Sequence, residues 1–162
     1  MSKGFFSNCF LNGIDGKNRL SIPSDYRAAV TARSGTRDLV IAPSRIAPCL
    51  LGYDETFSAQ LKAEHDARHA NQVSRERDRD ATGIFGVAAP LTIDDAGRIV
   101  LPSMLKKMRG IGSLVWFIGA GDFFQAWDPW TYLGFEDADP GVLEALEFTM
   151  DERGLPRERP AA

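Results

Sequence analysis

The alternation of apolar and polar residues divides the chain into short extended segments and a few helices. Extended patterns cover residues 5–14, 39–42, 48–53, 87–93, 114–117 and 123–128. Helical patterns cover 57–69, with Thr56 as a candidate N-cap, and 142–150. Many short strands and few long helices predict an α+β protein that is mainly β.

One part of this pattern occurs twice at a constant spacing. Residues 14–27 and 93–106 share an Ile, an Asp, an Arg, a Pro and a Ser at matching positions. Average amino-acid usage would give about one chance identity over such a window. Three further pairs are similar in kind: Leu20 and Ile99, Ile22 and Leu101, and Arg27 and Lys106. The chain is therefore a tandem repeat.

Each copy reads as a strand, a tight turn and a second strand. In the first copy Asp15 and Arg19 flank Gly16-Lys17-Asn18, and in the second Asp94 and Arg98 flank Asp95-Ala96-Gly97. Gly and Asn tolerate the positive φ that a tight reversal needs. After each turn, apolar residues alternate with the Arg, so the Arg should lie on the face that points away from the core.

A short helix is expected after each second strand. Pro23 and Pro102 end the strands, and Ser24 and Ser103 are candidate N-caps. Helices over 25–30 and 104–108 should follow, with stops at the glycines of positions 35 and 110.

The order Asp-x-x-x-Arg, alternating apolar residues, Pro and short helix resembles the AbrB-type swapped-hairpin DNA-binding module. Two copies in one short chain resemble the MraZ family, bacterial regulators associated with the division and cell-wall gene cluster. The resemblance spans about residues 5–150. Where the family usually has Lys-Gly before the first Arg, this chain has Lys17-Asn18.

This resemblance implies two AbrB-like swapped-hairpin modules that form a pseudo-two-fold small barrel with flanking helices. The expected domains are a first module at 5–56, a helical connector at 57–86, a second module at 87–135, and a C-terminal helix with a disordered acidic tail at 136–162. It further implies ring-like homo-oligomers that bind repeated DNA boxes, since many weak contacts then act together.

Sequence-specific binding of double-stranded DNA is the function that these residues favour. An outward Arg on a two-stranded ribbon can enter a major groove and bond a guanine edge, and we expect this of Arg19 first and Arg98 second. Lys17 would reach a phosphate. Four residues should support the hairpins: Asp15, Asp94, Asn18 and Gly97. The alternative is a protein-interaction module such as a toxin-neutralising protein, but a second module stands where such proteins have a disordered partner-binding segment.

The distribution of charge agrees with DNA binding although the net charge is −3. Residues 1–50 hold seven Lys or Arg against three Asp, whereas residues 119–162 hold three against ten acidic residues. A local basic hairpin is sufficient for phosphate contacts. No apolar run suits a membrane helix, and the N-terminus lacks the features of a signal peptide, so a cytoplasmic, nucleoid-associated protein is expected.

The residues suited to metal binding or catalysis indicate no enzyme, cofactor, metal or small-molecule substrate. Cys9 and Cys49 lack metal spacing and read as buried thiols. His65 and His69 lie one helical turn apart, but no Glu or third His completes a zinc motif, so a solvated helix face is expected rather than a metal-dependent hydrolase.

Two further groups of side chains each have two interpretations. The run 75–80 alternates Arg with acidic residues and reads as a solvated helix face, unless its arginines contact DNA or a neighbouring subunit. The aromatic residues of 116–135 read as core and subunit interface. A base-stacking surface is the alternative, but residues 111–135 contain no Lys or Arg.

Overall fold

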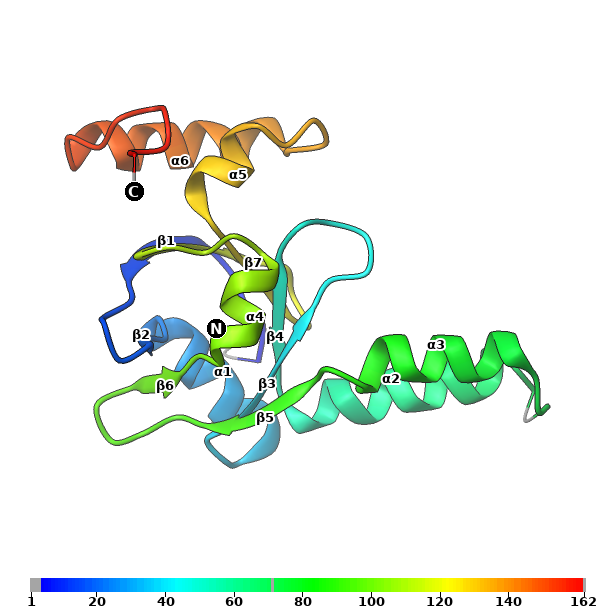
Figure 1. Ribbon diagram of the computed structural model, residues 1–162. Coiled ribbons are helices and arrows are strands. Elements are labelled where there is room, and N and C mark those ends of the chain that lie inside the picture. The colour runs from blue at the N-terminus through cyan, green and yellow to red at the C-terminus, as the bar shows by residue number, and fades with distance from the viewer. Residues whose placement is uncertain (1–3, 71, 162) are drawn as a thin grey trace.

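The computed structural model describes residues 4–70 and 72–161 and has an α+β fold with mainly antiparallel strands (Figure 1). This class is the one predicted. The strands are β1 (Cys9–Gly13), β2 (Arg19–Ser21), β3 (Asp38–Pro43), β4 (Leu50–Tyr53), β5 (Ala89–Thr92), β6 (Arg98–Val100), β7 (Leu114–Gly119) and β8 (Phe124–Trp127). The helices are α1 (Ser24–Ser34), α2 (Glu55–Arg68), α3 (Arg75–Phe85), α4 (Ser103–Met108), α5 (Pro129–Leu133) and α6 (Pro140–Glu152).

The large sheet has a symmetric strand order, β1-β7-β8-β4-β3-β5. Exchanging each strand with its counterpart in the other copy, β1 with β5, β7 with β3 and β8 with β4, gives the same order read from the other end. Each edge strand pairs with the other copy: Leu11 of β1 lies opposite Trp116, and Leu91 of β5 lies opposite Leu39. The two copies are therefore interleaved in one approximately two-fold structure.

The strands flanking each turn differ from the predicted hairpins. In the first copy a single bridge, Ile14 to Leu20, joins them, and β2 pairs instead with β6 of the second copy. This pairing places Leu20 opposite Ile99, and both side chains are 2% exposed. Burial of this apolar pair in a shared core favours pairing between copies over pairing within one. Hydrogen bonds among the described residues close no barrel, and β1 and β5 are open sheet edges.

Two clusters of buried side chains form the core. The first includes Ile14, Leu20, Tyr26, Ile99 and Phe117 and joins the small sheet, α1 and α4 to one face of the large sheet. The second joins β1, β7 and β8 to α5 and α6; its buried members are Leu11, Cys49, Trp116, Ile118, Trp127, Tyr132, Leu146 and Met150. The second cluster confirms the interpretation of the aromatic stretch as core, because buried rings are not available to stack on bases.

Several helix ends differ from prediction. Pro23 and Pro102 occupy the N-cap positions without side-chain hydrogen bonds, so Ser24 and Ser103 are the first helical residues instead. Asp54 caps α2 and accepts a 2.6 Å hydrogen bond from the hydroxyl of Thr56, the predicted cap. Gly35 ends α1 in the left-handed conformation, as expected.

The outer helices lie differently in the two halves (Figure 1). Helix α6 lies across β1, whereas α2 and α3 run side by side and project away from the sheet. In the part of the chain that the structure covers, no helix has both the length and the apolar character that a membrane crossing requires.

Candidate nucleic-acid interface

The small sheet of β2 and β6 brings both candidate arginines to one surface. In its register Arg19 lies opposite Val100, and Ser21 lies opposite Arg98. Because side chains alternate along a strand and Leu20 points into the core, these four residues share the outer face. The two arginines occupy diagonal positions, where Cα atoms are about 7–8 Å apart. One ribbon, built from one strand of each copy, therefore carries both arginines.

Asp15 organises the first turn. Its Oδ1 accepts hydrogen bonds from the backbone N–H groups of Lys17 and Arg19, both at 2.9 Å. Its Oδ2 accepts a 2.7 Å hydrogen bond from Nε of Arg19. Within the described chain neither Nη1 nor Nη2 of Arg19 has an acceptor, so the outer edge of this guanidinium is available to a ligand.

Asp94 organises the second turn in the same way but holds its arginine less closely. Its Oδ1 accepts from the backbone N–H groups of Ala96 at 2.8 Å and Arg98 at 2.9 Å. The side-chain ion pair is longer, with 3.6 Å between Arg98 Nε and Asp94 Oδ2. Nε of Arg98 is buried and has no hydrogen-bond partner among the described residues.

Both carboxyl groups have lowered pKa values. The backbone N–H of Arg19 makes the largest contribution at Asp15, and together with the Arg19 side chain and the N–H of Lys17 it lowers the pKa to about 2. The backbone N–H of Arg98 does the same at Asp94, followed by that of Ala96 and the charge of Arg98. Both aspartates are therefore ionised acceptors at neutral pH.

Each turn also contacts the helix of the other copy. The sequence did not predict these contacts. At the first turn, Asn18 donates from Nδ2 to Ser103 Oγ at 2.9 Å and accepts from Lys106 Nζ at 3.1 Å. At the second turn, Gly97 lies against the guanidinium of Arg27. Arg27 and Lys106 occupy matching positions in the two copies and both are positively charged. This match is the one feature of the sequence that could have pointed to a shared role beside the turns. Each turn thus lies beside a cation from the other copy.

The two turns differ in charge. The first carries Lys17 together with Lys106. The second has Ala96 at the position of Lys17 and an additional Asp95, which pairs with Arg37 at 2.9 Å. The first turn is therefore the more favourable for an anion.

The histidines are not on a solvated helix face, which corrects the prediction. His65 is 3% exposed, and Nδ1 of His65 and Nε2 of His69 each lie 2.9 Å from Oδ2 of Asp80 on α3. Arg45 and Arg68 bond the same carboxyl group at 2.6 Å. These hydrogen bonds, those of Arg45 and Arg68 first, hold the pKa of Asp80 well below its usual range.

This cluster has the spacing of a metal site but an unsuitable charge. One ligand atom each from His65, His69 and Asp80 lies within 4.8 Å of the other two. A cation there would have to displace Arg68 from the carboxylate and remain beside Arg45. The arrangement fits a hydrogen-bonded clasp between α2 and α3 better than a metal centre.

The remaining candidate residues from the sequence are the arginines of α3 and the two cysteines. Arg75 and Arg79 are exposed on α3, and neither side chain makes a hydrogen bond or ion pair with another described residue. Burial raises the pKa of the Cys49 thiol to about 12, and it also raises that of Cys9, so neither is an activated nucleophile.

The chain is similar over most of its length to several bacterial proteins named Transcriptional regulator MraZ. The protein from Parvibaculum lavamentivorans is 32% identical over an alignment of 149 residues, and this alignment covers 90% of this chain and 91% of that protein. The protein from Rickettsia akari is 33% identical over 145 residues, 90% of this chain and 95% of the relative. The protein from Beijerinckia indica is 37% identical over 126 residues, 76% and 74% of the two chains. No protein-family model matches the chain.

Proposed function

Because this chain belongs to the MraZ family of transcriptional regulators, we propose that it binds double-stranded DNA through the outer face of β2 and β6. The observation that supports this proposal most directly is the placement of Arg19 and Arg98 on one face of a single two-stranded ribbon. The relatives carry the name of a transcriptional regulator.

The ribbon has dimensions suited to the major groove, which admits a two-stranded β-ribbon. Arginines about 7–8 Å apart would span about two base-pair steps of 3.4 Å. The outer edge of Arg19 can donate two hydrogen bonds to O6 and N7 of a guanine while Asp15 holds Nε from behind. Arg98 would contact a nearby base from the other strand of the ribbon. Val100, 60% exposed, offers an apolar contact to a thymine methyl group.

The cations beside the turns would contact the DNA backbone. Lys17 lies at the tip of the first turn and is suited to a phosphate, where a flexible point charge is sufficient. Asp15, Asn18, Asp94 and Gly97 would not contact DNA but would hold the two turns in place. Asn18 does so from within the first turn through its bonds to the second copy.

The finer features of the proposal concern fold, assembly and target. The interleaved copies support two AbrB-like swapped-hairpin modules at 5–56 and 87–135, with a helical connector at 57–86 and a C-terminal segment at 136–162. We infer ring-like homo-oligomers that bind repeated boxes near division and cell-wall genes. In such an assembly several ribbons on one DNA molecule would raise the affinity through effective concentration. Its place in the cell would be the cytoplasm, on the nucleoid.

Mapping the sites bound on genomic DNA, followed by titration of one recovered fragment, tests the proposal. We expect tight binding to that fragment and binding at least about 10³-fold weaker to a shuffled fragment of the same composition. Equal affinity for both fragments would contradict sequence-specific recognition. No binding to either at low salt would contradict DNA binding itself.

A further inference from the structure

The C-terminal segment of the chain folds back onto the helices that precede it. After α6 the chain turns at Gly154, which has a φ of 65°, and residues 155–161 follow beside α6 (Figure 1). We name residues 155–161 the tail. Arg157 of the tail pairs with Glu147 and Asp151 of α6. All but the first residue of the tail are exposed, so it lies on the surface rather than in the core.

Two residues of the tail contact a small site at the start of α5, which we name the tail site. Nε1 of Trp130 donates a 3.0 Å hydrogen bond to the backbone oxygen of Pro156. Nη2 of Arg159 donates to Oδ2 of Asp128 at 2.6 Å and to Oγ1 of Thr131 at 3.2 Å. The guanidinium also lies over the indole of Trp130, with Cζ 5.9 Å from the ring centroid. The tail site thus holds a proline carbonyl and an arginine at the same time.

The carboxylate of the tail site is incompletely bonded. Asp128 is 0% exposed with the tail in place, and its Oδ1 has no hydrogen-bond partner among the described residues. Its Oδ2 accepts from the backbone N–H of Thr131 at 2.9 Å, from the Thr131 hydroxyl at 3.1 Å, and from Arg159. A guanidinium can bond both oxygens of a carboxylate, but Arg159 bonds only one. The tail therefore leaves unused one acceptor that a buried carboxylate normally has filled.

The first half of the molecule pairs the equivalent aspartate from its interior. Asp54 follows β4 as Asp128 follows β8, and each caps the next helix. Oδ1 of Asp54 accepts a 2.9 Å hydrogen bond from Nε of Arg33, whose side chain is 13% exposed. Arg159 is 49% exposed and belongs to a surface segment. The arginine of the second half can therefore be exchanged for another without opening the core.

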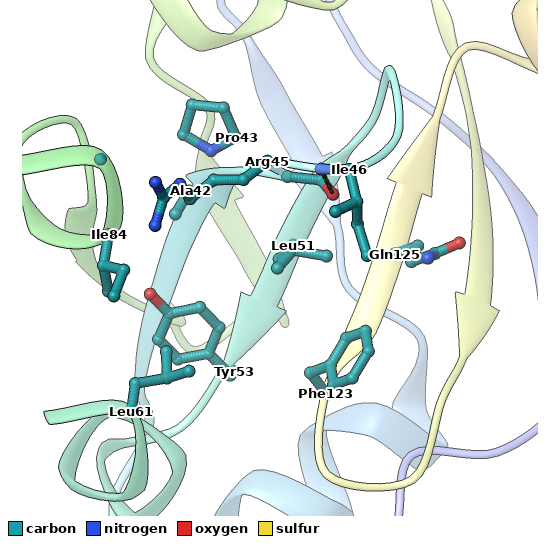
Figure 2. Close-up of a pocket in the computed structure, with 12 residues that line it drawn as sticks. Ala42, Pro43, Arg45, Ile46, Leu51, Tyr53, Leu61, Ile84, Phe123 and Gln125 are labelled. Atoms are coloured by element: carbon teal, nitrogen blue, oxygen red, sulfur yellow. Dashed lines mark hydrogen bonds between the residues drawn. The ribbon is translucent and has the colours of Figure 1, made fainter. Parts of the chain in front are cut away.

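The apolar hollow of the first half has different chemistry. Figure 2 shows this hollow, of about 210 Å³, between Leu61 and Ile84 of the projecting helices and Leu51 and Phe123 of the sheet side. Its described lining residues include neither a tryptophan nor a carboxylate. It is suited to apolar atoms, whereas the tail site combines an indole N–H, an aromatic face and a negative charge.

The tail site lies on the face of the large sheet opposite the proposed DNA-binding ribbon. Trp116 of β7 packs in the cluster that includes α5 and α6, whereas its neighbour Phe117 packs in the cluster that includes the small sheet. Because side chains alternate along a strand, these two clusters occupy opposite faces. A segment bound at the tail site would therefore leave the ribbon accessible.

We propose that the tail site binds a segment of a separate partner protein in which a proline lies three residues before an arginine. The proline carbonyl accepts from Trp130, and the arginine stacks on the indole and bonds both oxygens of Asp128. The tail occupies the site until such a segment displaces it. Residues 119–162 hold ten acidic residues against three arginines, which favours a basic partner. This inference goes beyond the proposed function, because it adds a protein-binding site to a DNA-binding surface.

Calorimetric titration of the full-length protein with a synthetic peptide of residues 154–161 tests the site. Arg159→Ala removes the arginine of the tail and so frees the site. We expect this variant to bind the peptide at least about 10-fold more tightly than the unmodified protein, whose tethered tail competes at roughly millimolar effective concentration. Arg153→Ala is the matched control, since Arg153 is exposed and precedes the tail, and it should bind like the unmodified protein. Equal affinity of Arg159→Ala and the unmodified protein, or no binding to either, would overturn the proposal.

Changes in the peptide and in Trp130 test the individual contacts. A peptide that carries Arg159→Ala should bind the freed site at least about 10-fold more weakly, because it lacks a hydrogen bond between charged groups. Trp130→Phe, added to the Arg159→Ala protein, keeps an aromatic face and removes the N–H donor, so affinity should fall about 5-fold. Circular dichroism confirms that both proteins are folded. Unchanged affinity in either experiment would contradict the recognition that we propose.

Two further measurements separate this inference from DNA binding and from contacts between copies. Saturating peptide should leave the affinity for the recovered DNA fragment unchanged, since the two sites lie on opposite faces. Loss of DNA affinity would overturn this independence, whereas failure of the fragment to bind without peptide would concern the proposed function alone. Light scattering should show the same mass with and without peptide. A lower mass with peptide would assign the site to the tail of a second copy and overturn the separate partner.

Discussion

Asn18 and Gly97 occupy the same position in the two copies, with φ values of 61° and 80°. The backbone oxygen of each accepts a hydrogen bond from the other copy: Leu101 N–H donates to Asn18 at 2.8 Å, and Ile22 N–H donates to Gly97 at 2.9 Å. Asn18 also bonds the second copy through its side chain, which donates to Ser103 and accepts from Lys106, whereas Gly97 has no side chain. Because Asp95 of the second turn also accepts from Arg37, the first turn makes three hydrogen bonds to the second copy and the second turn makes two to the first.

Asn18→Gly should preserve the turn and remove these two bonds. We expect the free energy of unfolding to fall by about 1 kcal/mol, because each net hydrogen bond contributes about 0.5–1.5 kcal/mol and one of the two is exposed. Asn18→Val should cost more, since a β-branched residue disfavours positive φ. Chemical denaturation measures both variants. Equal stability of Asn18→Gly and the unmodified protein would mean that the two side-chain hydrogen bonds of Asn18 do not contribute to the free energy of unfolding.

Arg19→Ala should weaken specific DNA binding most strongly. Loss of a base contact costs about 1–3 kcal/mol, and an oligomer that uses several ribbons multiplies the loss. Arg98→Ala should weaken binding less, because its turn carries Asp95 and lacks a lysine. Arg79→Ala, on exposed α3, is the matched control and should bind normally. If Arg79→Ala weakened binding as much as Arg19→Ala, the alternating run of α3 would be part of the interface instead.

Lys17→Ala should change the salt dependence rather than the sequence preference. A lysine that neutralises a phosphate releases counterions, so its removal should reduce the slope of log affinity against log salt by about 1. The ratio of affinities for the recovered and shuffled fragments should stay constant. Titrations from low to physiological salt measure both quantities. An unchanged slope would place Lys17 away from the phosphates.

Asp15 should contribute to stability only where it is ionised. Its folded pKa of about 2 lies below the usual value of about 3.9, so the charged form is favoured by folding. The contribution is complete above about pH 4 and is lost as pH falls toward 2. Asp15→Asn should therefore be less stable than the unmodified protein at neutral pH, with a difference that shrinks over this window. Denaturation at several pH values measures it, and a difference independent of pH would contradict the assignment.

Asp80→Asn should loosen the packing of α3 against α2. The change removes the charge that Arg45, Arg68 and two histidines share, and a hydrogen bond to a charged group contributes about 1.5–3 kcal/mol. Amide hydrogen exchange should become faster in α2 and α3 but not in β7. Asp78→Asn, on the exposed side of α3, is the control. Unchanged exchange in α2 would show that the hydrogen bonds of Asp80 do not stabilise the pairing of α2 with α3.

The repeat allowed the local elements to be predicted but not their partners. The alternation around Leu20 and Ile99 placed short strands correctly, and the positive φ of Asn18 and Gly97 followed from residue type. The pairing of β2 with β6 could not be deduced, because identical motifs can pair within a copy or between copies with the same side-chain pattern. Only burial of both apolar residues in a common core distinguishes the two arrangements.

The candidate site shows the same limit. Asp15 and Arg19 are close in sequence, so their contact was predictable from a turn. The bonds from Asn18 to Ser103 and Lys106 join residues far apart in the chain, and no local pattern encodes them. His65 and His69 were expected in solvent because the sequence of their helix is polar. They are instead hydrogen-bonded to Asp80, which lies on a different helix, α3.

Because both copies belong to one chain, the proposed DNA-binding ribbon does not require a palindromic target. A dimer of identical chains presents the same residues in both orientations, so its target must repeat itself in reverse. Here Lys17 and Ala96 occupy equivalent positions, but only Lys17 is charged, so the two ends of the ribbon are chemically different. We expect a bound box to read differently in its two orientations, and inverting one box within a fragment should then impair binding as a mismatch does.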